Sequence, residues 1–321
     1  MGREAKAEIA RQGDGVRGNV KQGIWRLVDP KITLASAASM FLGACAAARE
    51  GPIAWGWLVA SVAGIFCLEA AKNASGEIVD FDSGDDQAVA PEDRSPFSGG
   101  KRVLVDGMLT KAETAMVAAF GYGLGIVAGL GIAVFREPRI LWFGLAGVAL
   151  AYFYNAPPLK LSHRGVGELA VSITYGPLIC CGTYLVQRGE VTSDVLLVSI
   201  PLGLLIGAFL WINEFPDLRA DESAGKRTLV VRLGRRTASR LFAVLVATAY
   251  AWLWLLPPRG LPLSVWFGIA GLPFAVAAGR RLLAHSDVTR QIVPAQGWTL
   301  LSIVLFALGV GIGLVTGARG G

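Results

Sequence analysis

The chain of 321 residues is 53% hydrophobic and only 17% charged, and its mean hydropathy is +0.52. A soluble domain of this size would carry charges on about a quarter of its residues, so the composition predicts a polytopic membrane protein. The net charge of +6 comes without a basic stripe interleaved with aromatic residues. It therefore argues against nucleic acid as a partner and favours contact with the lipid bilayer or an anionic substrate.

The apolar residues form blocks of roughly 17 to 23 residues, the length that a bilayer-spanning helix needs. We expect an all-α protein with nine spans, at 32–49, 53–71, 112–134, 139–154, 169–187, 194–212, 237–256, 262–279 and 296–316. The polar residues 1–30 are expected to form a cytoplasmic tail, and residues 31–316 a single transmembrane domain. With the N-terminus inside, all but six of the 30 Lys and Arg residues fall in the tail and the inner loops. The positive-inside rule favours that orientation, which places the acid-rich segments in cytoplasmic loops.

A first acidic cluster follows the second span, between Asn73 and Asp86. If that span continues as a helix past the membrane surface, Asn73, Glu77 and Asp80 stand at i, i+4 and i+7 and share one face. An amide oxygen and two carboxylates form a hard-oxygen site, suited to Mg²⁺ that keeps several waters and binds phosphate as well. A solvated acidic loop is the alternative reading. The spacing leaves open which of the later acids would bind metal: Asp80, Asp82, Asp85 or Asp86.

Two polar loops supply cations and an aromatic side chain. Arg94 lies in a stretch rich in Gly and Pro that is flexible enough to close over a phosphate, although its charge also fits a role in topology alone. Tyr154, Lys160 and Arg164 flank the proline pair that ends the fourth span. In one reading, Tyr154 belongs to the belt of aromatic residues at the membrane surface, and Lys160 and Arg164 are positive charges that keep the loop on the inner side. They also fit a phosphate-binding lysine beside a tyrosine that hydrogen-bonds a departing oxygen.

A second acidic cluster follows the sixth span. Asn213, Asp217 and Asp221 stand at i, i+4 and i+8, again on one helical face, and Lys226 and Arg227 come shortly after. Two such faces can supply carboxylates to two Mg²⁺ ions that bridge a diphosphate, while the two cations neutralise the remaining charge. A salt-bridged surface helix is the alternative. It does not explain why the Asn-x-x-x-acid pattern occurs twice, each time after a span.

The two clusters place acids that can hold a metal beside bases that can hold phosphate, and both groups lie at the membrane edge. This arrangement favours chemistry on a lipid diphosphate. A diphosphate is a good leaving group once metals and cations carry its negative charge. The lipid tail would lie among the helices, and the apolar bundle would shield an allylic cation from capture by water. The pattern therefore favours an enzyme that ionises a prenyl diphosphate.

Across roughly residues 20–316 the chain resembles the UbiA superfamily of intramembrane prenyltransferases, and in particular its menaquinone-type branch. The resemblance rests on three motifs: Asn73-x-x-x-Glu77 with the acids that follow, the Tyr154-Asn-Ala-Pro-Pro-Leu-Lys160 loop, and Asn213-x-x-x-Asp217-x-x-x-Asp221 followed by Gly225-Lys226-Arg227-Thr228. It implies nine transmembrane helices around a central cavity, in the cytoplasmic membrane of a prokaryote. It also implies Mg²⁺-dependent transfer of a prenyl group from a polyprenyl diphosphate to an aromatic ring.

The resemblance assigns roles to residues at the matching positions. The metal and diphosphate would be held by Asn73, Glu77, Asp217 and Asp221. Lys160, with Lys72 as a second candidate, would contact the phosphates, and Tyr154 would lie close to the reacting head. Glu77 stands where the family usually has Asp.

The sequence leaves alternatives open both for the identity of the acceptor and for the class of protein. We expect 1,4-dihydroxy-2-naphthoate as the acceptor, and a hydroxybenzoate, a quinolone or another specialised ring is the alternative. A membrane transporter or cation carrier is the alternative from another class. Against it, the charges gather at one membrane face and only Glu69 is ionisable at depth within the spans, whereas a translocation path usually needs more such groups. A non-catalytic scaffold would leave the paired motif unexplained.

Overall fold

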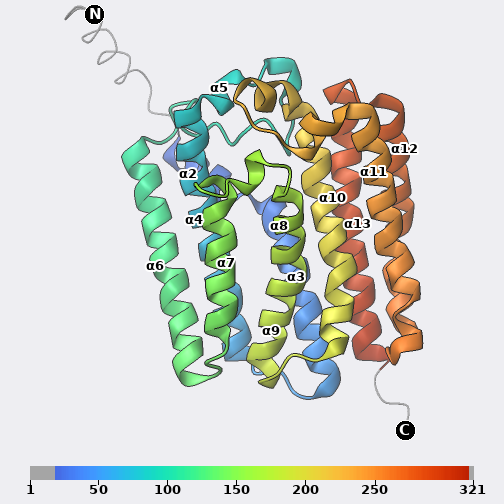
Figure 1. Ribbon diagram of the computed structural model, residues 1–321. Coiled ribbons are helices and arrows are strands. Elements are labelled where there is room, and N and C mark those ends of the chain that lie inside the picture. Colours follow the sequence, from blue (N-terminus) through green and yellow to red (C-terminus); the bar gives the residue numbers. More distant parts are fainter. Residues whose placement is uncertain (1–18, 318–321) are drawn as a thin grey trace, which may run out of the picture.

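The computed structural model describes residues 19–317, which form an upright bundle of long helices and contain no strand (Figure 1). The long helices are α3 (Pro30–Glu50), α4 (Trp55–Ser83), α6 (Lys111–Phe135), α7 (Ile140–Asn155), α10 (Ser193–Ser223), α11 (Leu229–Trp254) and α13 (Thr289–Thr316). Two further spans are composite. One joins α8 (Gly167–Ile173), the π-helical turn η3 (Thr174–Leu178) and α9 (Ile179–Arg188), and the other joins the 3-10 helix η5 (Leu263–Gly271) to α12 (Leu272–His285).

Short helices cover the ends of the bundle. They are α2 (Val20–Val28), α5 (Asp85–Ala88), η1 (Pro91–Asp93), η2 (Leu161–His163) and η4 (Pro257–Arg259). Residues 1–18 of the expected tail lie outside the described residues. The rest of that segment includes α2, which buries Leu27 and packs against α4. Helix α2 ends at Val28, Asp29 separates it from α3, and Pro30 begins α3 at a position where its missing N–H is not needed.

The expected all-α membrane architecture is confirmed. Within residues 19–317, eight helical segments are long and apolar enough to cross a bilayer, and α7 is a shorter apolar helix. Together they correspond to the nine predicted spans.

The acid-rich segments, expected in loops, are mostly helical extensions of two spans. The predicted spans 53–71 and 194–212 continue without interruption to Ser83 in α4 and to Ser223 in α10. Helix α4 stops only at Gly84, whose φ of +82° is a conformation that glycine adopts without steric penalty. Both acidic motifs therefore stand on rigid helices.

Helix α10 is the most deeply buried of the described spans, and its end lies near the end of α4. The short helix α5 contacts α10 and lies at the same end of the bundle as the turn that follows α10 (Figure 1). We call this the motif end. At the other end, α13 packs closely on η5, because a Cβ on Gly313 would lie 2.1 Å from the Ser264 carbonyl oxygen. Such small residues let membrane helices approach one another.

Candidate active site

The ammonium of Lys226 lies among carboxylates from three segments of the chain. It hydrogen-bonds to Asp85 of α5 and lies 3.3 Å from Asp80 of α4 and 4.0 Å from Asp221 of α10. We call Asp80, Asp85, Asp221 and Lys226 the acidic centre. Sequence reasoning selected three of these residues, and it left Asp85 among the undecided acids.

The turn after α10 brings Lys226 back to the acids. Its backbone N–H donates to the Asp221 carbonyl oxygen at 2.8 Å, and Gly225 before it has a φ of +76°. This reversal directs the side chain toward α10 instead of solvent. Burial lowers the pKa of the Lys226 ammonium, but Asp80, Asp85 and Asp221 more than offset that effect, so the pKa is raised. These neighbouring carboxylates therefore favour the charged ammonium form of Lys226.

The site contains more carboxylates than the single ammonium of Lys226 can neutralise. Burial, reinforced by the neighbouring Glu77, Asp80 and Asp85, raises the pKa of Asp86 to about 7. Three buried carboxylate oxygens have no hydrogen-bond partner: Asp85 Oδ1, Asp86 Oδ2 and Asp217 Oδ1. Asp217 interacts electrostatically with Asp221 and Asp85.

These residues fit a hard divalent cation. Their donors are all carboxylate oxygens, the ligands that Mg²⁺ prefers, and several of these oxygens lack a partner. In the described part of the chain, no three His, Cys, Asp or Glu side chains already stand in a metal-binding arrangement. The acids converge on the Lys226 ammonium instead, which neutralises part of their charge.

A loop between α5 and α6 covers the carboxylates with backbone groups. The N–H of Leu104 donates to Glu77 Oε1 at 2.9 Å, and the N–H of Gly99 faces Asp217. Arg102 donates to the Asp86 carbonyl oxygen at 2.6 Å. Gly100 lies so close to Asp86 that an added Cβ would fall 1.9 Å from its Oδ1. The sequence left open whether this stretch closes over a phosphate or only sets topology, and in the structure its backbone groups cover the acids.

We expect Gly100→Ala to lower kcat/KM by about 10-fold or more, because its Cβ would displace Asp86 or the loop and small misplacements near a reacting centre are costly. Gly107→Ala is the matched control. Both glycines have a positive φ, +73° and +64°, so both variants carry left-handed backbone strain of about 1–2 kcal/mol. Nothing lies within 4 Å of a Cβ at Gly107. Steady-state kinetics on both variants would refute the prediction if they lost activity equally.

The two motif asparagines tie the helices together. Asn73 donates from Nδ2 to the Leu27 carbonyl oxygen at 3.0 Å, and Asn213 Oδ1 accepts from Gln296 Nε2 of α13 at 3.0 Å. Gln296 was not singled out from the sequence, although an amide inside the otherwise apolar block 296–316 was an available signal. The asparagines thus fix the helix positions on which the acids stand.

Four other predicted cations lie in loops outside the acidic centre. Arg94, Lys160, Arg164 and Arg227 are exposed. The Arg164 side chain donates to the Pro158 carbonyl oxygen at 2.9 Å. The backbone N–H of Arg227 donates to the His163 carbonyl oxygen at 3.1 Å. The structure does not bring these four side chains into the acidic centre.

Two buried acids near the site were not predicted as site residues. Glu168 of α8 accepts from the Leu229 N–H at 2.9 Å, which fixes the start of α11. Glu214 of α10 has an unpartnered oxygen, Oε2, and interacts electrostatically with Tyr154. The sequence carried a weak signal for Glu214, since it directly follows Asn213.

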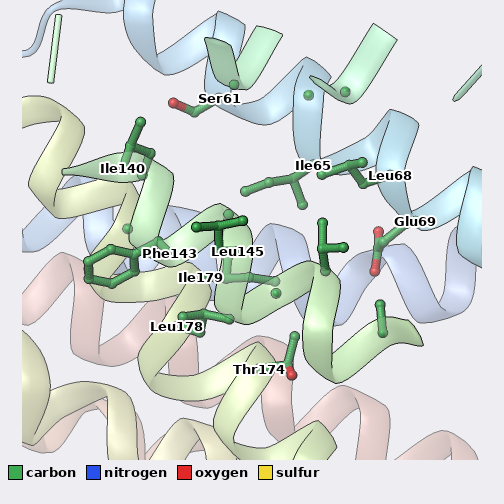
Figure 2. A pocket seen from close by; sticks show the side chains of 18 of the residues that line it. Ser61, Ile65, Leu68, Glu69, Ile140, Phe143, Leu145, Thr174, Leu178 and Ile179 are labelled. Carbon is green, nitrogen blue, oxygen red and sulfur yellow. The ribbon is translucent and has the colours of Figure 1, made fainter. Parts of the chain in front are cut away.

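A cavity of about 380 Å³ opens among α4, α6, α7 and the α8–α9 span (Figure 2). Its wall is almost wholly apolar and includes Ile65, Leu68, Phe143 and Leu145. Along α4 it extends from Ala60 to Lys72, a rise of about 18 Å. Lys72 and Tyr154 mark its end toward the acidic centre, where the Lys72 ammonium lies 5.2 Å from the centre of the Tyr154 ring. An apolar chamber thus begins beside the charged site.

Comparison with known proteins identifies this arrangement. The model of the UbiA prenyltransferase family matches residues 36–292. The chain belongs to the UbiA prenyltransferase family. It is therefore an integral membrane protein and a membrane-embedded prenyltransferase, as the motifs predicted.

Similar proteins include several that are named 1,4-dihydroxy-2-naphthoate octaprenyltransferase. The chain is 28% identical over 231 residues to the 1,4-dihydroxy-2-naphthoate octaprenyltransferase of Bacillus subtilis, covering 72% of each chain. It is 29% identical to the protein of that name from Mycobacterium tuberculosis, covering 67% of this chain and 73% of the relative. These similarities support the resemblance to the menaquinone-type branch.

Solved structures share the fold. The apo structure of a UbiA homolog from Aeropyrum pernix superposes with a TM-score of 0.68 at 19% identity, covering 87% of this chain and 97% of that one. A UbiA homolog from Archaeoglobus fulgidus, bound to GPP and Mg²⁺, superposes with a TM-score of 0.57 at 13% identity, covering 92% and 99%.

Proposed function

We propose that this prenyltransferase transfers a prenyl group from a polyprenyl diphosphate to a hydroxylated aromatic ring in quinone biosynthesis of the menaquinone type. The observation that carries the proposal is the junction of the acidic centre with the apolar cavity. A diphosphate and a long hydrocarbon tail need opposite surroundings, and here the two surroundings adjoin. The naphthoate relatives support 1,4-dihydroxy-2-naphthoate as the acceptor.

We assign the diphosphate end to the motif end of the bundle. Asp80, Asp217 and Asp221, with Asn73 and Glu77 beside them, would hold Mg²⁺, which when bound neutralises the diphosphate and so improves it as a leaving group. Lys226 is close enough to this site to contact the phosphates. Lys160, Arg164, Arg227 and Arg94 surround it and would attract the anion electrostatically.

The cavity would hold the reacting end of the tail away from water. Tyr154 and Lys72 line its end, where the allylic carbon would lie, and the cation–π contact between them shows that the tyrosine ring faces a positive charge. An allylic cation would form at this end of the cavity, away from the ring face that the Lys72 ammonium occupies. The apolar wall excludes the water that would otherwise capture that cation.

The topology follows from the same assignment. We propose that the motif end faces the cytoplasm of a prokaryote, with residues 1–30 on that side and residues 31–316 as the catalytic domain. The water-soluble acceptor would then enter from the side where it is made. The diphosphate product would leave on the side where it is used.

The test uses the purified full-length chain in detergent with a radiolabelled prenyl diphosphate, Mg²⁺ and a panel of aromatic acceptors that includes dihydroxynaphthoate, hydroxybenzoate and a quinolone. We expect a prenylated product that disappears with EDTA and returns with added Mg²⁺. Product from another ring alone would change the acceptor within the proposal. Diphosphate consumption that is unaffected by EDTA would reject the metal assignment, and flux of cations in liposomes without product would reject prenyl transfer.

A further inference from the structure

A buried arginine on α11 contacts the middle of the second acidic motif on α10. The Arg235 side chain is only 14% exposed. Its Nη2 donates to the carbonyl oxygen of Phe215 at 3.1 Å, and Phe215 stands between Asn213 and Asp217 of the motif. Its Nη1 donates at 3.1 Å to the carbonyl oxygen of Asp287, in the turn between α12 and α13. One guanidinium thus joins the motif to two other parts of the bundle.

The cost of burying this charge indicates that Arg235 has a role. The Asp287 carboxylate lies 4.0 Å from the guanidinium and is 82% exposed, so solvent screens the pair. Among the described residues, the buried Nε has no hydrogen-bond partner. An apolar side chain of similar volume is often at least as stable at such a position as an incompletely paired charge. What Arg235 adds is a pair of donors for the two carbonyl oxygens.

The backbone turns sharply just before this side chain. Gly234 has a φ of +71° and a ψ of 154° and interrupts the helical conformation inside α11. This conformation is essentially restricted to glycine. Nothing lies within 4 Å of a Cβ at Gly234, so the glycine serves the backbone conformation and not close packing. The break sets the direction in which Arg235 leaves the helix.

Pro216 explains why this turn of α10 needs a contact from another helix. Proline has no backbone N–H, so the Ile212 carbonyl oxygen lacks the hydrogen bond that residue 216 would give it in a regular helix. The missing bond falls inside the motif, one residue before Asp217. Arg235 binds the carbonyl oxygen of Phe215, directly before the proline. It therefore supports the helix at the point where its own hydrogen bonds are incomplete.

The position of this turn determines where two acids of the motif stand. Asp217 and Asp221 follow the proline on one face of α10, and Asp221 lies 4.0 Å from the Lys226 ammonium. A small displacement of α10 at the proline would shift both carboxylates relative to the acids on α4 and α5. Removing a group that orients metal ligands usually lowers metal affinity or activity by about 10- to 100-fold.

We propose that Arg235 is a positioning residue for the metal-binding acids of α10. It holds the Phe215 carbonyl oxygen and so fixes the turn of helix from which Asp217 and Asp221 extend, without touching metal or substrate. This inference rests on the proposed function, because it requires that these two acids bind the divalent cation.

The first experiment titrates Arg235→Met and wild type with Mn²⁺ and follows the free ion by electron paramagnetic resonance. Methionine is a long side chain that donates no hydrogen bond. We expect the Mn²⁺ Kd to rise about 10-fold, and the Mg²⁺ concentration that gives half the maximal initial rate to rise by a similar factor. Arg235→Lys, which can still donate to one carbonyl oxygen, should lie between the two. Arg236→Met, at the exposed next arginine, is the matched control and should bind Mn²⁺ as wild type does.

A double-mutant cycle separates positioning from general stability. Pro216→Ala supplies the missing N–H for the Ile212 carbonyl oxygen, so the turn depends less on Arg235. In the Arg235→Met background, we expect Pro216→Ala to lower the Mn²⁺ Kd by at least about threefold, with Pro216→Ala alone measured to close the cycle. Additive effects on the Mn²⁺ Kd would overturn the proposal, even if Arg235→Met lowers Tm.

The outcomes separate this inference from the proposed function. If wild type binds Mn²⁺ and Arg235→Met binds it equally tightly, the inference is wrong and the function stands. If wild type neither binds Mn²⁺ nor requires a divalent cation, the metal assignment of the proposed function fails, and the inference fails with it. Should Arg235→Met not yield folded protein, Arg235→Lys takes its place, and an unchanged Kd in that variant would contradict the proposal.

Discussion

Asp221→Asn is expected to lower kcat/KM at least about 100-fold, the usual loss when a group that stabilises developing charge is removed. Asp221 is 6% exposed and stands on α10, where it faces Lys226, Asp80 and Asp85 across the acidic centre. Asparagine keeps the shape but removes the negative charge that a divalent cation requires. Mg²⁺ titrations of initial rate should therefore show a higher Mg²⁺ requirement as well as a lower maximum.

Asp82→Asn is the matched control for this prediction. Asp82 belongs to the same acid-rich stretch as Asp80, but its side chain is 55% exposed and pairs with Lys111. We expect its activity to stay within about twofold of wild type, as for an ordinary surface ion pair. Equal losses in the two variants would mean that the region responds to total charge and that the acidic centre has no special role. Full activity in Asp221→Asn would remove Asp221 from the site.

Lys226→Met is expected to lower both activity and stability. The Lys226 side chain is 13% exposed and contacts three acids. Removing one partner of a buried charge pair destabilises a protein by about 3–5 kcal/mol, because the remaining charges are left uncompensated. In a thermal melt without divalent cations, we expect Tm to fall by roughly 5 to 10 °C.

Mg²⁺ makes this prediction specific to the acidic centre. A bound divalent cation would replace the missing positive charge, so Mg²⁺ should raise the Tm of Lys226→Met by more than it raises that of wild type. Arg227→Met is the control, since Arg227 is exposed beside it and its loss should leave Tm within about 2 °C. An equal effect of Mg²⁺ on wild type and Lys226→Met would show that metal and lysine do not share the same acids.

Local patterns in the sequence were sufficient to predict the membrane spans and the helical face that each acidic motif occupies. Blocks of apolar residues set the number of helices, since a bilayer fixes their length. Helical periodicity placed Asn213, Asp217 and Asp221 on one face, and α10 is indeed helical from Ser193 to Ser223. These features depend on residues a few positions apart, so no tertiary information was needed.

The tertiary structure decided which of these residues meet. Lys226 bonds to Asp85, which is 141 residues away, whereas Asp82 in the same acidic stretch pairs with Lys111 outside the centre. Neighbouring acids have nearly identical sequence surroundings, and only the direction in which each helix position faces separates them. Glu69 appeared in the sequence as a lone charge in an apolar span. Its hydrogen bond from Ser36 of α3 and its place on the cavity wall depend on how α3, α4 and α8 pack, because burial and hydrogen bonding across helices are properties of the assembled bundle.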